Sequence, residues 1–386
     1  MAKEGKKALV PKLRFPEFRD AEEWKPKLLG EVCGMQAGKF IAASEISEKQ
    51  SEGLHPCFGG NGLRGYTRNY NQSGRYSLIG RQGALCGNVI LVEGDFYATE
   101  HAVVTTPKAG ISTDWNFYNL YLLNLNRFAT GQAQPGLSVD VLEKVNCAVP
   151  KDEKEQKKIA DCLSSLDELI AAQGRKVEAL KTYKRGLMQQ LFPREGENLP
   201  RLRFPEFRDA PAELVTVGEF AKVTTGAKDT QNKVDGGTYP FFVRSQNVER
   251  IDSFSYDGEA VLTSGDGVGV GENYHYINGR FDFHQRVYCI CDYTHETSGK
   301  FFFHYFSTHF KKRVKQMSAK NSVDSVRMSM ITEMPVWMPS LAEQLRIAEC
   351  LSSLDTKITA ESATVEAFEA HKRGLMQQLF PSLEEA

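Results

Sequence analysis

The same stretches of sequence occur twice in this chain, and this duplication limits its possible folds more than any other feature. Three segments return almost letter for letter in the second half: LRFPEFRDA (13–21 and 202–210), EQKKIADCLSSLD with EQLRIAECLSSLD (155–167 and 343–355), and KRGLMQQLFP (184–193 and 372–381). Each half therefore has the same plan, which is a short lead-in, a long body whose letters have diverged, and a long segment whose letters have not.

The undiverged long segments carry apolar residues in alternating steps of three and four, which is the heptad pattern of a coiled coil. In the first segment these residues are Ile159, Leu163, Leu166, Ile170, Val177, Leu180, Leu187 and Leu191. In the second they are Ile347, Leu351, Leu354, Ile358, Val365, Phe368, Leu375 and Leu379. Gln173 and Lys184 interrupt the first stripe, and Glu361 and Lys372 interrupt the second at the same points. Each segment predicts a helix of about 40 residues, about 60 Å long.

Both predicted helices have recognisable ends. Their starts have the spacing of capping boxes and their stops are prolines: Asp152 with Glu155, Ser340 with Glu343, then Pro193 and Pro381. A stripe this narrow needs a partner helix. Because one chain holds two copies, we expect an intramolecular antiparallel coiled coil with pseudo-twofold symmetry. The alternative is a coiled coil that pairs with another molecule.

The diverged bodies, 22–150 and 211–339, share a layout. Both contain short strand-like runs punctuated by glycine, followed by an aromatic helical stretch and a polar loop. We therefore expect an α+β protein in which two mixed α/β domains in tandem repeat are separated by two long helices. The expected boundaries are a first domain at 1–150, a first helix at 151–193, a linker with the second domain at 194–339, and a second helix with a tail at 340–386.

The loops of both bodies are rich in side chains that can recognise base edges, since arginine pairs with guanine, and asparagine or glutamine with adenine. The candidates in the first body are Asn61, Arg64, Arg81, Gln82, Gln132 and Gln134. Those in the second body are Arg244, Ser245, Gln246, Asn247, Ser264, Asp266 and Asn321. A simpler interpretation of Asn61 and Asn247 is that they are ordinary turn residues.

One basic run, at 311–320, suits contacts with phosphates, which position a protein on DNA without conveying sequence. Its candidate residues are Lys312, Lys315 and Lys320, although a charged run on a helix is more often only a solvated face. The formal net charge of the chain is −1, so any DNA-binding surface has to be a local patch on a nearly neutral protein.

Several kinds of chemistry are disfavoured by spacing. The glycine-rich run 265–271 leads into another strand-like run, whereas a dinucleotide site needs a helix there. No P-loop sequence occurs, so we expect no ATP hydrolysis by this chain. Cys289 and Cys291, with His284 and His295 nearby, are spaced too closely for a structural zinc site and suit the core face of one strand. We predict no catalytic residue, metal or cofactor in the chain itself.

Targeting and redox signals are also missing from the sequence. The eight cysteines follow no disulfide framework, and no stretch has the pattern of a signal peptide or a membrane span. We therefore expect a cytoplasmic protein with free thiols.

Taken together, the repeated motifs resemble those of type I restriction–modification specificity subunits. The resemblance rests on the LRFPEF lead-ins, the EQ..IA..L..LD helix starts that follow a proline, and the KRGLMQQLFP helix ends, and it covers almost the whole chain. It implies two target recognition domains, each reading one half of a split DNA site, and helices that set the unspecified spacer. It also implies base contacts by Arg64, Arg81, Gln82, Arg244, Gln246 and Asn247.

The resemblance further implies catalytic partners. The helices would dock two methyltransferase subunits, which use S-adenosylmethionine to methylate adenine in double-stranded DNA. Restriction subunits that use ATP and magnesium would join through them, and this chain would be the non-catalytic specificity subunit. Two alternatives stay open. The first is a stand-alone duplicated DNA-binding regulator, which would bind its site without partners. The second is a coiled-coil scaffold that does not bind DNA, and a strong salt dependence of DNA affinity would exclude it.

Overall fold

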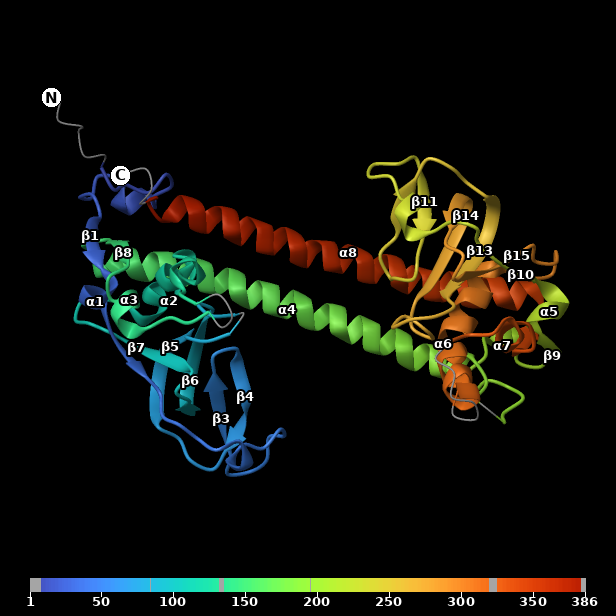
Figure 1. The fold of residues 1–386 in the computed structure, drawn as a ribbon, viewed down its shortest axis with the longest axis horizontal. Coiled ribbons are helices and arrows are strands. Elements are labelled where there is room, and N and C mark those ends of the chain that lie inside the picture. The colour runs from blue at the N-terminus through green and yellow to red at the C-terminus, as the bar shows by residue number, and fades with distance from the viewer. Residues whose placement is uncertain (1–7, 84, 132–134, 195, 319–324, 383–386) are drawn as a thin grey trace. The chain divides into compact units, whose positions relative to one another are not determined.

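The computed structural model describes residues 8–83, 85–131, 135–194, 196–318 and 325–382. Its contacts divide the chain into two compact units (Figure 1). The first unit combines Met1–Gln173 with Thr364–Ala386, and the second is Gly174–Ala363. Each unit thus holds one body together with the start of one long helix and the end of the other.

Six strands form the main sheet in the described part of the first unit, in the order β2-β7-β5-β6-β3-β4. They are β2 Cys33–Ala37, β3 His55–Gly59, β4 Gly62–Thr67, β5 Gln72–Gly80, β6 Val89–Ala98 and β7 Ala102–Pro107. Neighbours run antiparallel except β3 and β6, which are parallel. The remaining elements are the strand pair β1 Lys25–Leu28 and β8 Asn146–Val149, the helices α1 Leu29–Val32, α2 Thr113–Leu122 and α3 Val139–Leu142, and the 3-10 turns Pro16–Phe18, Ala43–Glu45 and Leu125–Phe128.

The end of β5 is buried on both faces of this sheet, and its sequence explains why. Successive strand residues point to opposite faces. Ile79 joins the core that contains Trp115 of α2, whereas its neighbour Leu78 joins a separate cluster with Phe96. Because apolar side chains lie on either side, the end of β5 is buried throughout.

The described part of the second unit repeats this topology, with strand order β10-β15-β13-β14-β11-β12 and the pair β11 and β14 parallel. The strands are β10 Lys222–Thr225, β11 Tyr239–Phe242, β12 Glu249–Ile251, β13 Tyr256–Ser264, β14 Tyr274–Phe283 and β15 Val287–Cys291. The other elements are the strand pair β9 Ala212–Thr216 and β16 Pro335–Pro339, the helices α5 Val217–Phe220, α6 Gly299–Ser318 and α7 Met328–Thr332, and the 3-10 turns Pro205–Phe207 and Thr230–Asn232. The predicted mixed α/β fold is therefore confirmed in both bodies.

Two sequence predictions about this second body are also confirmed. The glycine-rich run 265–271 lies between β13 and β14, so a strand follows it and not a helix. Cys289 and Cys291 both pack in the cluster that contains Phe281 and Phe283, as expected for residues on one core-facing side of a strand.

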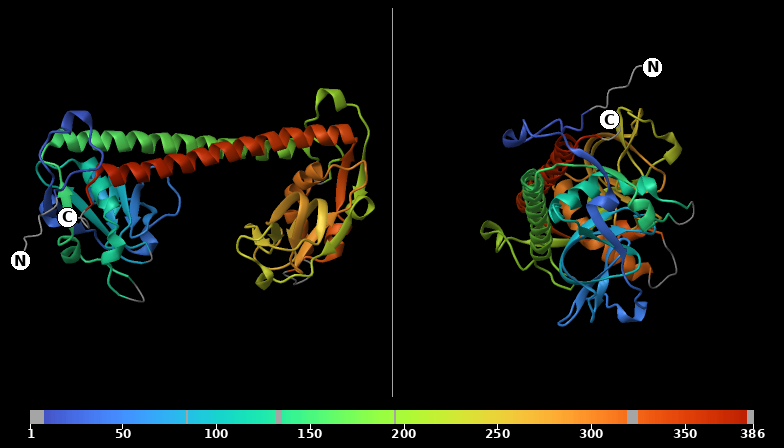
Figure 2. Two further views of the ribbon diagram at one scale, coloured as in Figure 1. Left: turned by 90° about the horizontal axis from the view of Figure 1, so that it is seen from above. Right: turned by 90° about the vertical axis from the view of Figure 1, so that its left-hand side faces the viewer.

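The long helices are α4 Glu153–Leu191 and α8 Leu341–Leu379, and each passes from one unit into the other. In the first unit Ile159 near the start of α4 shares a core with Leu379 at the end of α8. In the second unit Leu191 at the end of α4 shares a core with Ile347 near the start of α8. The helices therefore pack antiparallel within each unit, as predicted (Figure 1, Figure 2). Every predicted apolar stripe position is buried or half-buried.

Three of the polar interruptions of the stripe form ion pairs across the helices, and one of them is Glu361, which binds Lys176 of α4. Lys184 of α4 binds Asp355 of α8 in the second unit, and Lys372 of α8 binds Asp167 of α4 in the first. The same pair thus occurs once in each unit with the helices exchanged. Such pairs favour one register over its neighbours, because a slip by one turn would separate the charges.

The aspartates of these pairs also meet an aromatic side chain from the body. In the first unit the Tyr118 hydroxyl donates to Asp167 at 2.7 Å, and burial followed by this bond raises the pKa of Tyr118. In the second unit His304 lies near Lys184 and Asp355. Burial, and then the neighbouring Lys184, lowers the pKa of His304 to about 4, so the ring is neutral at pH 7.

The repeated lead-ins are explained by a buried ion pair in each unit. Arg14 donates from Nε and Nη2 to Glu155 at 2.7 and 2.8 Å, and Arg203 donates in the same way to Glu343. These glutamates were predicted to close capping boxes at the helix starts. Their carboxylates instead hold the lead-in arginines, because a buried carboxylate needs a cation and several donors around it.

Candidate nucleic-acid interface

Three turns meet beside the main sheet of each unit, and we call this group the turn cluster. In the first unit it comprises residues 59–62 where β3 turns into β4, 81–83 after β5 and 99–101 after β6. The Arg81 amide donates to the His101 carbonyl at 3.0 Å, and the Thr99 amide donates to the Phe58 carbonyl at 2.9 Å. These main-chain bonds tie the turns together.

The turn cluster of the second unit comprises the turn 244–247 after β11, the start of the loop after β13 at 265–266, and residues 284–286 after β14, and it has the same main-chain bonds. The Gly265 amide donates to the Arg286 carbonyl at 2.8 Å, and the His284 amide donates to the Phe242 carbonyl at 2.9 Å. Position 265 therefore corresponds to Arg81, and Arg286 corresponds to His101. The same main-chain arrangement, which we call the frame of the turn cluster, therefore carries different side chains in the two units.

Glycines let the turns of the first unit approach each other closely. A Cβ added to Gly80 would lie 2.0 Å from the Gly60 carbonyl oxygen, and one added to Gly60 would lie 2.9 Å from the Gln82 oxygen. Real Cβ atoms do not tolerate such distances, so only glycine fits at these two positions without moving the backbone.

The first turn cluster encloses an open hollow of about 440 Å³. Among its lining residues are Asn61, Arg64 and Gln82, which sequence reasoning had singled out, and His101, which it had not. Arg81 is half-buried beside it. The predicted Gln132 and Gln134 lie outside the described residues.

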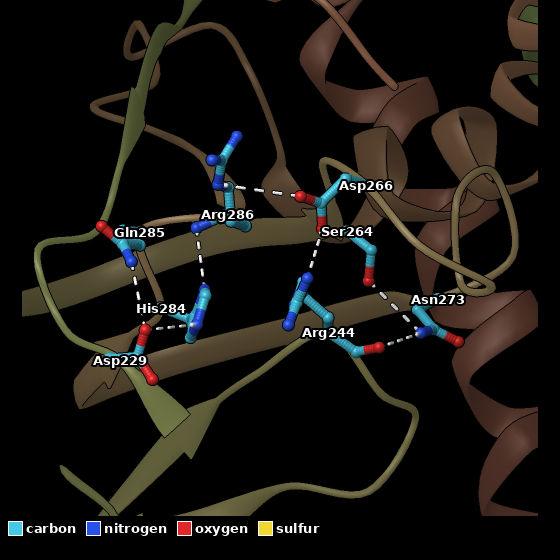
Figure 3. A network of polar contacts seen from close by, with 8 residues as sticks. All are labelled: Asp229, Arg244, Ser264, Asp266, Asn273, His284, Gln285 and Arg286. Atoms are coloured by element: carbon cyan, nitrogen blue, oxygen red, sulfur yellow. Dashed lines mark hydrogen bonds and ion pairs between the residues drawn. The ribbon is translucent and has the colours of Figure 1, made fainter. Parts of the chain in front are cut away.

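In the second unit Arg244, Ser264 and Asp266 are brought together (Figure 3). Arg244 Nη1 donates to Asp266 Oδ1 at 2.9 Å. Asn273 Nδ2 donates to the Arg244 carbonyl at 3.2 Å and to Ser264 Oγ at 3.3 Å. The polar turn at 244–247 is thereby anchored to the loop that follows β13.

The other predicted residues of this turn have more local roles. The Ser245 hydroxyl donates to the Asn247 carbonyl at 2.9 Å, which closes the turn, and the Ser245 carbonyl contacts His275 Nε2 at 3.0 Å. Gln246 and Asn247 are exposed. Their exposed side chains suit contact with a ligand, while the main chain at Asn247 serves as an ordinary turn.

Sequence reasoning missed the turn between β14 and β15, which brings a second arginine to the cluster. Arg286 Nε lies 3.7 Å from Asp266 Oδ2, and the Arg286 amide donates to His284 Nδ1 at 2.9 Å. Gln285 Nε2 donates to Asp229 Oδ2 at 3.1 Å (Figure 3). The residues of this turn differ from those of the corresponding turn 99–101 in the first unit. Only the structural correspondence of the two units could therefore have indicated it.

His284 is a structural part of this turn. Its side chain is 3% exposed, and burial, followed by the charge of Arg244, lowers the pKa of the ring while Asp229 opposes the change. The neutral ring accepts the Arg286 amide at Nδ1 and faces Asp229 with Nε2 at 3.8 Å. It therefore fixes the main chain that carries Arg286.

The basic run on α6 does not form a single surface. Lys311 pairs with Glu272, and Arg313 donates to the Met330 carbonyl at 2.7 Å. Lys312 is exposed and lines a separate hollow of about 520 Å³ that contains none of the turn residues. Lys315 is exposed. The predicted Lys320 and Asn321 lie outside the described residues.

Neither a metal site nor a membrane helix is found in the described part of the chain. No group of three or more histidine, cysteine, aspartate or glutamate side chains there could hold a metal ion. No described helix is both long enough and apolar enough to cross a bilayer. All eight cysteines are free thiols.

Comparison with known proteins places this geometry in a family. The model of the type I restriction modification DNA specificity domain matches residues 21–182 and again 211–368. The specificity subunit of the type I restriction enzyme EcoprrI from Escherichia coli is 49% identical over 158 residues. That match spans 41% of this chain and only 39% of the relative's length.

Two further proteins are similar over nearly the whole chain. The specificity subunit of the type I restriction enzyme MjaVIII from Methanocaldococcus jannaschii is 23% identical, with 94% of this chain and 93% of the relative covered. The crystal structure of a type I restriction–modification S subunit from M. genitalium has a TM-score of 0.70 at 15% identity, covering 97% of this chain and all of that one. The fold of that S subunit is therefore shared along the chain.

Proposed function

The chain belongs to the type I restriction–modification DNA specificity family, and from this premise we propose that each of its units reads one half of a two-part DNA site. The observation that carries the proposal is the turn cluster. Both units build it with the same main-chain hydrogen bonds but fill matching places with different polar side chains, such as His101 and Arg286. A common frame with different side chains is what reading two different half-sites requires.

The surroundings of the turn cluster are consistent with DNA contact. Arg64 on strand β4 and Gln82 on a turn are exposed in the first unit, and Arg244 and Gln246 on a turn are exposed in the second. These are the side-chain types that recognise base edges in the major groove. Because the net charge of the chain is −1, binding has to depend on such local groups and not on the overall field.

In this proposal the chain itself performs no catalysis. Methyltransferase subunits docked on α4 and α8 would use S-adenosylmethionine to methylate adenine, and restriction subunits that use ATP and magnesium would join them. The two helices would set the number of unspecified base pairs between the half-sites. The removal of one heptad from a helix should then change that spacer, or the folding, and leave each half-site preference intact.

The test is to co-express the chain with its candidate methyltransferase partner and to map methylated adenines across a genome by single-molecule sequencing. A motif of two short specified blocks around a fixed gap is the expected result. An active complex whose methylation follows no split motif would overturn the proposal and favour a scaffold role. Tight, specific binding by the chain alone, with no partner recruited, would favour a stand-alone regulator instead.

A further inference from the structure

We propose that Arg244 and Arg286, held by the shared carboxylate of Asp266, read guanine in the half-site bound by the second unit. The inference rests on the proposed function and names the base that one half of the molecule prefers. Its basis is the arrangement of three charged side chains from three separate turns (Figure 3).

The contacts with Asp266 leave other N–H groups of both guanidinium groups available to bind a base. Arg244 uses Nη1 toward Asp266 at 2.9 Å, and Arg286 turns its Nε toward the same carboxylate at 3.7 Å. An Nη group carries two hydrogens, so each guanidinium keeps a pair of neighbouring N–H groups for another acceptor. The O6 and N7 atoms of guanine accept such a pair in the major groove. The arginine side chains are 44% and 65% exposed, which leaves room for a base edge.

Both arginines are held in place before any ligand binds. The Asn273 amide holds the Arg244 carbonyl, and the His284 ring holds the Arg286 amide. Asp266 restricts the guanidinium groups themselves. A free arginine loses rotamer entropy when it is fixed, and a carboxylate that restricts it in advance reduces this loss on binding.

The carboxylate also argues against a phosphate as the ligand of these arginines. A phosphate placed against Arg244 and Arg286 would lie next to Asp266, whose like charge repels it. A guanine edge is uncharged and presents only acceptors to the arginines. Asp266 is therefore expected to favour a base over the backbone.

The first unit provides an internal control, because its frame is the same and its side chains are not. His101 stands at the place of Arg286, and Gln82 stands one residue after Arg81, as Asp266 follows Gly265. Among the described residues of the first turn cluster, Glu100 pairs with His101, and no carboxylate bridges two arginines. Changes to the arginine pair should thus leave the half-site of the first unit unaltered.

The experiment uses the full chain in complex with its methyltransferase partner, and methylated motifs are mapped for the wild type and for variants. Arg244→Lys and Arg286→Lys keep the charge but lose the paired donors. Each should reduce the preference for a guanine in one half-motif about tenfold or more, the order of discrimination of a bidentate contact. Gln82→Ala, the matched control, should relax only the other half-motif.

A second readout separates base contacts from phosphate contacts. If Arg286 contacts a base, Arg286→Ala should lower the base preference in one half of the motif. If it contacted a phosphate, the variant would weaken binding to all sequences alike and lower the slope of log affinity against log salt concentration by about 0.9. Asp266→Asn, a change at a positioning residue, should raise affinity for unrelated DNA and lower the preference for the motif. Urea unfolding of each variant confirms that it is folded.

The possible failures are distinguishable. If the wild-type complex yields no split motif, the proposed function fails. A split wild-type motif whose two halves both stay unchanged in the lysine variants would overturn only the assignment of guanine to Arg244 and Arg286. The same conclusion would follow if the lysine variants alter a half that contains no guanine on either strand. The same holds if Asp266→Asn sharpens the preference.

Discussion

The buried ion pair between Arg14 and Glu155 makes a quantitative prediction about stability. The two side chains are 7% and 2% exposed, and Glu155 accepts two bonds from Arg14 and a third, at 3.2 Å, from the indole of Trp24. Glu155→Gln leaves the guanidinium buried without its counter-charge and puts an amide group where three donors converge. Removal of one partner of such a pair costs about 3 to 5 kcal/mol, so the free energy of unfolding should fall by that amount.

The assay is urea unfolding followed by tryptophan fluorescence, which the chain allows unit by unit. Its three tryptophans are Trp24 and Trp115 in the first unit and Trp337 in the second. In a Trp337→Phe background the signal comes from the first unit alone. The matched control is Glu22→Gln, which breaks an ion pair with Lys151 whose side chains are 64% and 61% exposed. This control should leave the unfolding midpoint nearly unchanged.

A loss below about 1 kcal/mol for Glu155→Gln, the range of an exposed pair, would refute the reasoning. The double variant Arg14→Met with Glu155→Leu should recover most of the loss, because it removes both charges together. Arg203 and Glu343 repeat the arrangement in the second unit, so Glu343→Gln should show a similar loss there.

Three further outcomes are expected. The pKa of His304 is about 4 in the folded chain, against 6.5 for an unburied histidine, so the stability that depends on a neutral ring is present above pH 6.5 and is lost as the pH falls toward 4. His304→Tyr should flatten this loss in urea unfolding at pH 7 and 4.5, and an unchanged pH profile would contradict it. Lys184→Glu should cost about 1 kcal/mol in thermal unfolding, and Asp355→Lys in the same chain should restore it. Gly80→Ala should push back the Gly60 carbonyl and weaken only the first half-site in DNA competition, whereas equal loss at both halves would point to general misfolding.

The helices were predictable because their signal is local and occurs twice. A heptad stripe constrains every third or fourth residue over the whole length of α4 and α8, and the antiparallel pairing then explains the lysines that interrupt it. Strand order was not predictable, since the parallel contact of β3 with β6 joins segments that are far apart in sequence. The sequence also suggested boundaries at the helix ends, while the contacts divide the chain inside the helices, after Gln173 and after Ala363.

The candidate site was predictable only in part, for a related reason. Polar residues in glycine-rich turns can be recognised from sequence, and Asn61, Gln82, Arg244 and Asp266 do meet in turn clusters. Arg286 was missed because its turn contains no glycine and because its role depends on Asp266, which approaches from another strand. Side chains that act together through tertiary contacts leave no pattern in the local sequence.

The turn cluster and the lead-in ion pair show why the two copies could diverge at some positions and not at others. The amide of Arg81 and the amide of Gly265 donate the same hydrogen bond, and no side chain contributes to it. Substitution at such a position keeps the frame, so the turns can exchange polar groups at little cost in stability. The lead-in arginine and its glutamate bond through their side chains, and neither can change alone without leaving a buried charge. The turn residues whose main-chain atoms make the bonds can thus diverge to read new bases, whereas the lead-in arginine and its glutamate have to stay.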